Sequence, residues 1–409
     1  MQKLKKIGVA FACGVLILLV TWKYQNYDYT FNLEDNFFKK VSTFRDKVYS
    51  PPPKRTADFV FINTGKDLTL IEDTIDYGNV AISDREKILQ LFRFLNVTPR
   101  GPRFCVLDIQ FYYPYNIQPS VDSMLQRELT AYGKVVLPVV KNPNGLYAKP
   151  IYTATYGHSN YRTFGSAFNK FRILIQEEIK SIPIVMHEKI DKAKYLDHFY
   201  YPTCNGRLCL SAIWPTYYLK DSDLKKSTNI KSLEEIEGAR QVAKKTTLGT
   251  AEYLNLGELL FDIEANPDAY LRAFENKIMI IGNFQEDVHV TPIGKISGPV
   301  LLANLYLSLL NHEHLVSPWL LLLMVASFSG LSYVALYKKM PELNIKFKFM
   351  LSSYLTKFIK SYVSYFGAMF AISLVAFLIF NVQIALFMPS AIFTGIEYIK
   401  AKKYLELKN

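Results

Sequence analysis

The residues best suited to chemistry lie in one short stretch toward the end of the hydrophilic part of the chain. Asp287 and His289 are two positions apart, so the carboxylate could orient the imidazole or form a polar pocket with it. They follow an apolar run that ends at Gly282, and open α/β sheets bind ligands beyond the carboxyl ends of their strands. Asp108 ends a similar apolar run. The sequence therefore allows Asp108, Asp287 and His289 to converge on one ligand-binding crevice.

A structural interpretation of the same residues is also open, and it is the one that the sequence alone favours. Asp287, Thr291 and the nearby glycines could hold a tight turn through bonds from side chain to backbone. The residues of that motif turn are Gly282, Pro292, Gly294 and Gly298. Asp108 could likewise cap a helix or a turn.

Motifs for catalysis, cofactors and metals are missing from the sequence. It contains no P-loop, no His-Glu-x-x-His pair and no dinucleotide fingerprint, so we expect neither enzymatic activity nor a cofactor. A periplasmic enzyme has only the Asp287–His289 pair in its favour. His312, Glu313 and His314 could ligate a metal, but they adjoin an apolar segment, where polar residues are expected at a membrane rim. We therefore expect no metal site.

Four cysteines are present. Cys204 and Cys209 flank an Asn-Gly turn, which is typical of a hairpin, and outside the cytoplasm we expect a disulfide between them. Cys105 lies in an apolar run and is predicted to be a buried, inert thiol.

The sequence pattern around these residues predicts an α/β fold with a mostly parallel sheet. Apolar runs rich in β-branched and aromatic residues predict buried strands at 57–63, 104–109, 135–140 and 276–282. Ser83 and Glu86 have the spacing of a capping box, and helices are expected from there to 95, at 121–132 and at 298–310. Strands that alternate with helices pair in parallel. Residues 171–175 and 208–213 resemble further strands, but 141–248 otherwise has no clear pattern, and 283–297 is expected to be a loop.

Three segments without charged residues predict membrane spans, at 7–22, 318–337 and 361–396. A span needs about 20 apolar residues, so the second segment fits one helix, with Ser317 as its N-cap and Pro318 as its first residue. The third is too long for one span and divides at Asn381 into two, the last kinked by Pro389; a re-entrant last helix is the alternative. A cleaved signal peptide is the alternative for the first.

The positive charge of the chain follows these segments. The net charge is +12, which by itself could indicate nucleic-acid binding. Thirteen lysines, however, lie before the first segment, between the second and third, and after the last. With four spans all three places face one side, which the positive-inside rule makes cytoplasmic. The rest of the chain is nearly balanced, so we expect no nucleic-acid partner.

The predicted organisation is one anchor, one large outer domain and three spans near the C-terminus. Its parts are an anchor at 1–22, an extracytoplasmic domain at 23–315, spans at 316–337, 361–380 and 381–396, a basic cytoplasmic loop at 338–360 and a basic cytoplasmic tail at 397–409. Both termini are expected in the cytoplasm.

The closing part of the outer domain resembles the CHASE2 family of bacterial extracytoplasmic sensor domains. The matching positions are Ile281, Gly282, Asp287, His289, Thr291, Pro292, Gly294, Gly298, Ala303 and Asn304. Phe59–Asn63, Arg85, Asp108 and Asp122 match more weakly. The chain departs from the family at 63–65, where acidic residues are usual, and at 82–84, where Trp-Pro is usual before the Arg. The resemblance implies an α/β sensor domain between one N-terminal and three C-terminal spans.

Two functions are compatible with these observations. The first, implied by the resemblance, is a sensory or ligand-binding protein of the bacterial inner membrane. Family members commonly continue into a kinase or cyclase and this sequence does not, so the signal would pass to a membrane or periplasmic protein partner. The second is a structural or docking subunit of a multi-subunit envelope complex. Membrane lipid is a partner in both.

Overall fold

The computed structural model of the protein describes most of the chain as two compact units. The described residues are 2–25, 32–49, 58–73, 78–97, 100–141, 146–159, 168, 170–173, 179–197, 202–210, 212–221, 224–226, 252–341 and 353–406. The α/β unit comprises Asp46–Tyr195 and Pro215–His312; the helical unit comprises Met1–Arg45, Leu196–Trp214 and Glu313–Asn409. Residues 196–214 thus group with the helices, whereas the sequence placed them within one continuous outer domain.

The core of the α/β unit is an eight-stranded sheet in the order β13-β14-β1-β15-β4-β5-β6, with β7 also pairing with β5. Its strands are β1 (Phe59–Asn63), β4 (Phe104–Asp108), β5 (Val135–Lys141), β6 (Tyr147–Ala148), β7 (Thr155–His158), β13 (Lys225–Lys226), β14 (Glu252–Asn255) and β15 (Ile278–Gly282). The pairs are parallel except β5 with β6. The predicted α/β class with a mostly parallel sheet is confirmed.

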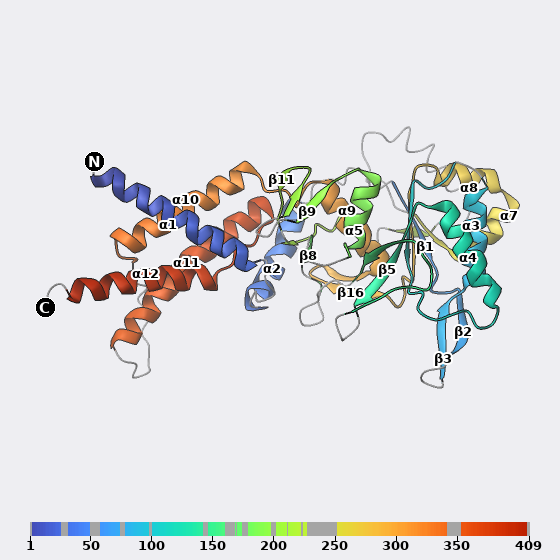
Figure 1. Ribbon diagram of the computed structural model, residues 1–409, viewed down its shortest axis with the longest axis horizontal. Coiled ribbons are helices and arrows are strands. Elements are labelled where there is room, and N and C mark those ends of the chain that lie inside the picture. Colours follow the sequence, from blue (N-terminus) through green and yellow to red (C-terminus); the bar gives the residue numbers. More distant parts are fainter. Residues whose placement is uncertain are drawn as a thin grey trace. The chain divides into compact units, whose positions relative to one another are not determined.

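Helices cover both faces of this sheet (Figure 1). One apolar core joins alternate residues of β1, β4 and β15 to α3 (Arg85–Asn96), α4 (Pro119–Tyr132), α7 (Leu256–Ala265) and α8 (Pro267–Phe274). On the other face lie α5 (Ile182–Ile190) and α9 (Gly298–Leu310), where the Tyr306 ring meets Phe59 at 6.0 Å between centroids. Because both faces are covered, the central strands β1 and β15 are buried at every position, as parallel strands usually are.

Two local predictions in this unit were wrong. The N-cap of α3 is Asp84, whose side chain accepts hydrogen bonds from the backbone N–H of Glu86 and Lys87, because Ser83 is already the last residue of a strand. That strand is β3 (Gly78–Ser83), which pairs with β2 (Leu68–Asp73). The expected loop at 283–297 contains a hairpin of β16 (Val288–Thr291) and β17 (Gly294–Ser297).

Among the described residues of the middle of the chain, the strands outside the large sheet are short. They are β8 (Phe171–Arg172), β9 (Tyr195–Asp197), β10 (Pro202–Cys204), β11 (Arg207–Leu208) and β12 (Ala212–Ile213). The predicted strand at 208–213 is therefore divided between β11 and β12, and residues 174–175 of the other predicted strand lie outside the described part.

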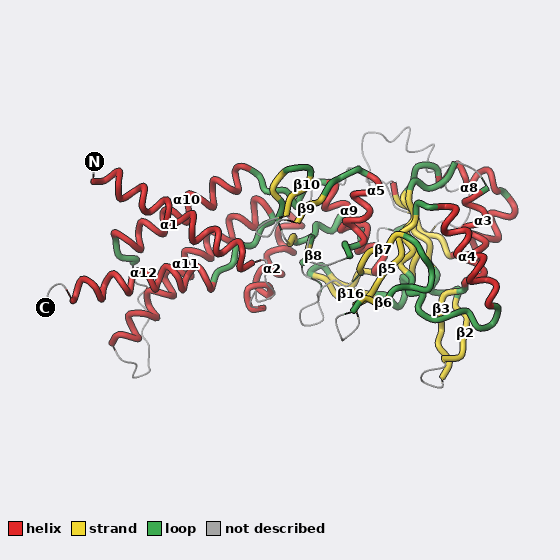
Figure 2. Tube along the Cα trace, in the orientation of Figure 1, coloured by secondary structure: helices red, strands yellow, loops and turns green. Residues whose placement is uncertain are grey.

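Four long helices form the membrane-like part of the helical unit (Figure 2). They are α1 (Gln2–Gln25), α10 (Pro318–Tyr337), α11 (Ser353–Phe380) and α12 (Phe387–Glu406), and α2 (Asn32–Tyr49) precedes the α/β unit in sequence. Among the described residues, three helices are long and apolar enough to cross a membrane: Gln2–Tyr24, Pro318–Tyr337 and Leu355–Phe380. Ser317 caps α10 as predicted, accepting from the N–H of Leu320.

The fourth predicted span is not shown. Helix α12 starts at Phe387 rather than at 381 or 382, so Pro389 lies in its first turn, where proline disturbs no helical hydrogen bond and causes no kink. Helix α12 nevertheless packs along α11 and α10. It thus has the place of a bundle helix without the apolar length of the other three.

Helix α1 packs most closely against α10. A Cβ atom at Gly14 would lie 2.6 Å from the Cα of Ser329, so only glycine permits the two backbones to approach this far. At the start of the same helix, the Lys6 ammonium lies 5.5 Å from the centre of the Tyr337 ring. The first residues of α1 therefore adjoin the last residues of α10.

The last helix closes the same end of the bundle. Lys400 of α12 donates to the carbonyl of Ala335 at 2.8 Å and also to that of Lys338, which are among the unpaired carbonyls that end α10. Ser361 of α11 donates to Glu397 at 3.2 Å. The described lysine-bearing ends of the four helices are thus gathered at one end of the bundle.

Polar contacts also order the other end of the helical unit. Asn381 and Gln383, in the connection between α11 and α12, bind the backbone carbonyl and the indole N–H of Trp214 at 2.6 and 3.1 Å. Leu210 donates its N–H to the carbonyl of His314, and Val316 donates to that of Leu208. The residues just before α10 are therefore paired with the β10–β11 hairpin.

Candidate functional site

A cavity of about 460 Å³ lies at the carboxyl edge of the sheet. Strands β4 and β15 end side by side there, with Asp108 opposite Gly282. Asp108, Asp287 and His289 all line the cavity, so the structure brings together the three ionisable residues proposed from the sequence. The other lining residues are Leu68, Val80, Ala81, Ile82, Ser83, Ile109, Gln110, Tyr112, Tyr113, Pro138, Val140, Ser159, Asn283, Glu286, Gly298 and Leu302.

The Asp287 side chain is held between the β16–β17 hairpin and the start of α9. Its Oδ1 lies 3.1 Å from Nε2 of His289, and its backbone carbonyl accepts from the N–H of Gly298 at 2.7 Å. A Cβ atom on Gly298 would overlap Oδ2 of Asp287, so glycine at this position admits the carboxylate. Asp287 and His289 remain 40% and 29% exposed, and both are accessible from the cavity.

The ionisable groups in the cavity differ in how readily they are protonated. Burial, and after it the neighbouring Asp287 carboxylate, raise the pKa of Asp108 to about 8 against the opposing effect of His289. The hydrogen bond to Asp287 raises the pKa of His289 above its usual range. Near neutral pH, Asp108 is therefore largely protonated, and the raised pKa of His289 favours the charged imidazolium beside the Asp287 carboxylate. Such separated titrations are frequent at functional sites.

The motif turn has the structural role that the sequence favoured, but only in part. Thr291 is buried, and its hydroxyl donates to the carbonyl of Gly294 at 2.7 Å. Gly294 has a φ of 124°, which non-glycine residues avoid. Thr291, Pro292 and Gly294 thus shape the hairpin, whereas the Asp287 carboxylate contacts His289.

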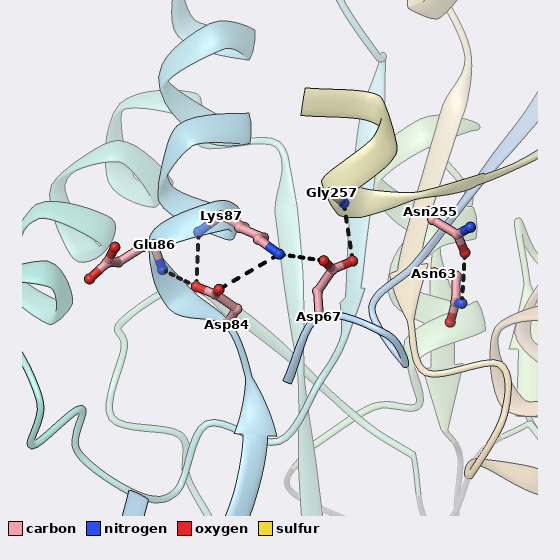
Figure 3. A network of polar contacts seen from close by, with 7 residues as sticks. All are labelled: Asn63, Asp67, Asp84, Glu86, Lys87, Asn255 and Gly257. Atoms are coloured by element: carbon pink, nitrogen blue, oxygen red, sulfur yellow. Dashed lines mark hydrogen bonds and ion pairs between the residues drawn. The ribbon is translucent and has the colours of Figure 1, made fainter. Parts of the chain in front are cut away.

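The other half of the same sheet edge carries a polar network that sequence reasoning missed (Figure 3). Asp67 accepts from the Lys87 ammonium at 2.6 Å and from the Gly257 N–H at 3.1 Å. Asn63 donates to the hydroxyl of Tyr253 at 2.8 Å and to Oδ1 of Asn255 at 3.1 Å. The network ties the ends of β1 and β14 to α3 and α7.

A buried ion pair joins α3 to α4. Arg85 is 1% exposed and lies 2.6 Å from Asp122, which also accepts from the Tyr152 hydroxyl and the Tyr115 N–H at 2.6 and 2.8 Å. The guanidinium also lies within 6 Å of the ring centres of Phe111, Tyr115 and Tyr152. Arg85 and Asp122 are thus spatial neighbours, but neither of them lines the cavity.

Cys204 and Cys209 are separate thiols in this structure, and the disulfide between them stays a prediction. In the β10–β11 hairpin Cys204 pairs with Arg207, and the Cys209 N–H bonds to Pro202. The two cysteines are therefore diagonal rather than opposite. Burial raises the pKa of Cys209 to about 12.

Comparisons with known proteins found no relative: no family model, no curated protein and no solved structure matches the chain. The function has to be argued from the geometry above.

Proposed function

We propose that this protein is a sensory membrane protein that binds a ligand or protein partner at the Asp108–Asp287–His289 cavity and signals through a second protein. The observation that carries this proposal is the cavity itself. It lies where open α/β sheets bind ligands, its volume is in the range of small-molecule sites, and its ionisable groups are not fully compensated. The resemblance to CHASE2 sensor domains agrees with this reading.

The proposed topology has four spans, both termini in the cytoplasm and the α/β unit outside it. Three helices are apolar and long enough to cross a membrane. The fourth proposed span, α12, is supported by its packing. Helix α12 lies along α10 and α11, and Lys400 binds the carbonyls that end α10. Lysines gathered at one end fit the cytoplasmic face of a bacterial inner membrane.

The route for a signal runs along the chain from the cavity. Gly298 lines the cavity and is the first residue of α9. Seven residues separate the end of α9 at Leu310 from Pro318, and three of them, 314–316, are bonded to the β10–β11 hairpin. So short and ordered a connection absorbs little movement, which supports transmission from α9 to α10.

A docking subunit of an envelope complex is the second candidate. It is favoured by the β2–β3 hairpin, on which Leu70 is 63% exposed. Exposed apolar side chains on a projecting hairpin suit binding to another protein.

Crosslinking in native membranes tests both functions. A photoreactive residue at Leu322 of α10, which is 58% exposed, would report the partner of the helices. Under the sensory function, Asp287→Asn changes the yield of that crosslink because the cavity and α10 are coupled. An unchanged yield, with a partner still captured, would support the docking function and contradict the sensory one.

A matched pair of insertions tests the route itself. Four Gly-Ser residues between His312 and Glu313 lengthen the connection ahead of the strand pairing, whereas the same insertion between Gly133 and Lys134 enlarges an exposed turn. We expect only the first to remove the effect of Asp287→Asn on the crosslink. Loss of the effect in both variants, or in neither, would show that α9–α10 is not the route.

A further inference from the structure

The charges that line the cavity indicate the class of its ligand. Three acids, Asp108, Glu286 and Asp287, are among the described lining residues, and no lysine or arginine is. His289 is the one basic group among them, and it is engaged with Asp287. A ligand that enters the cavity therefore meets an excess of carboxyl groups.

Elsewhere on this sheet edge an acid is neutralised by the protein. Asp67 has Lys87 at 2.6 Å, and Asp122 has Arg85 at the same distance. At the cavity, Asp108 and Asp287 instead face each other. Asp108 retains a proton there because burial and Asp287 oppose its ionisation. A cation placed between the two carboxyl groups would replace this proton and remove the repulsion.

The rest of the lining distinguishes an organic cation from a metal ion. Tyr112 and Tyr113 line the cavity together with apolar residues, among them Val80, Ile82 and Val140. Aromatic and apolar walls suit the carbon skeleton of an ammonium compound, whereas Ca²⁺ and Mg²⁺ require six or more oxygen ligands close around one point. The volume of about 460 Å³ also far exceeds that of a bare ion.

We infer that the cavity binds a small organic ammonium ion, with Asp287 and Asp108 facing its positive charge and the tyrosine-lined wall accommodating its carbon skeleton. This inference rests on the proposed function, because it names the ligand class of the same site. Binding should release a proton from Asp108 near neutral pH. The other titratable groups that line the cavity are Glu286, Asp287, His289, Tyr112 and Tyr113.

Calorimetry on the full chain in lipid nanodiscs tests the inference. The probes are choline and putrescine, the neutral isostere neohexyl alcohol, acetate, and Mg²⁺ and Ca²⁺ alone. We expect an ammonium probe to bind, and Asp287→Asn to weaken it roughly tenfold or more, as expected when a contact to a charge is lost. Glu264→Gln, on the exposed surface of α7, should leave the affinity unchanged. Wild-type titrations in two buffers of different ionisation enthalpy should show proton release.

Four results would overturn the inference: neohexyl alcohol binding as tightly as choline, preferential binding of acetate or a metal ion, binding that survives Asp287→Asn, or no binding of either ammonium probe at tens of millimolar. Wild-type proton release does not depend on a variant folding. The proposed function is judged separately, because an effect of Asp287→Asn on the Leu322 crosslink would support sensing even if neither ammonium compound binds.

Discussion

The two halves of the sheet's carboxyl edge use similar residues in opposite ways. Beyond β1 and β14, Asp67 is only 7% exposed in its side chain and is bound by Lys87 and by the N-terminus of α7. Beyond β4 and β15, Asp108 and Asp287 share a single histidine beside an open cavity. A buried carboxylate stabilises a fold when its charge is paired and hydrogen-bonded. The first half therefore stabilises the fold, and the second gives up stability for a site that can bind.

The largest expected effect comes from removing the ion pair between Arg85 and Asp122. Arg85→Ala leaves the partly buried Asp122 without its cation, and we expect a loss of about 3 kcal/mol in the free energy of unfolding. Alkylation of Cys105, buried in β4 and unreactive because burial raises its pKa to about 12, measures opening of the core by mass spectrometry. Arg93→Ala on the exposed side of the same helix is the control. Equal labelling rates in the two variants would mean that the pair contributes nothing.

Removing Asp67 should have the next largest effect. Asp67→Ala eliminates the contact to Lys87 and the hydrogen bond from Gly257, for a loss of about 2 kcal/mol. Asp84→Ala, which removes the N-cap of α3 and a longer contact of 4.0 Å to the Lys87 ammonium, should cost about 1 kcal/mol. The same labelling of Cys105 ranks the two. A larger loss from Asp84→Ala would contradict the role given to Asp67 in tying α3 to α7.

Rising pH should destabilise the half of the sheet edge that carries the cavity. Asp108 has a folded pKa of about 8 against an ordinary value of 3.8, so between these values the folded state keeps a proton that the unfolded state has lost. The free energy of unfolding then falls as pH rises, by at most about 1.4 kcal/mol per pH unit. The raised pKa of His289 acts in the same direction. Melting temperatures from about pH 5 to pH 8 should fall less steeply in Asp108→Asn, and an identical slope would exclude Asp108 as the source.

Two glycines give the smallest and most selective comparison. A methyl group on Gly257 would lie 2.7 Å from Oδ1 of Asp67, which cannot move without losing its two partners. A methyl group on Gly298 would overlap Asp287, which can turn into the cavity. We expect Gly257→Ala to cost about 1 kcal/mol more than Gly298→Ala, and only Gly298→Ala to abolish choline binding in the nanodisc titration. The reverse pattern would show that the cavity half is the rigid one.

The elements that could be predicted from sequence are those whose signals are local. The apolar runs gave β1, β4, β5 and β15 to within a few residues, and Ser317 before Pro318 correctly marked the start of α10. Asp108, Asp287 and His289 could be grouped because parallel strands bring their carboxyl ends to one edge.

Other features depend on contacts that no local pattern contains. Asp67 binds partners 20 and 190 residues away, so nothing in its neighbourhood distinguishes it from an exposed loop aspartate. The disulfide between Cys204 and Cys209 depends on strand register as well as on spacing in the sequence, so the Asn-Gly turn alone cannot decide it. The start of α12 was misplaced because residues 382–386 are uncharged and mostly apolar but not helical.

The close pairing of α1 with α10 through Gly14 constrains the order of events during synthesis. About 290 residues lie between these helices. A ribosome adds ~5–20 residues per second, so α1 is complete roughly 15–60 s before its partner exists. Throughout that interval the Gly14 surface of α1 has no α10 to pack against. Several ribosomes on one messenger bring nascent chains close together, which favours pairing of α1 with the α10 of another copy. Slow, dilute expression should therefore give more correctly assembled protein.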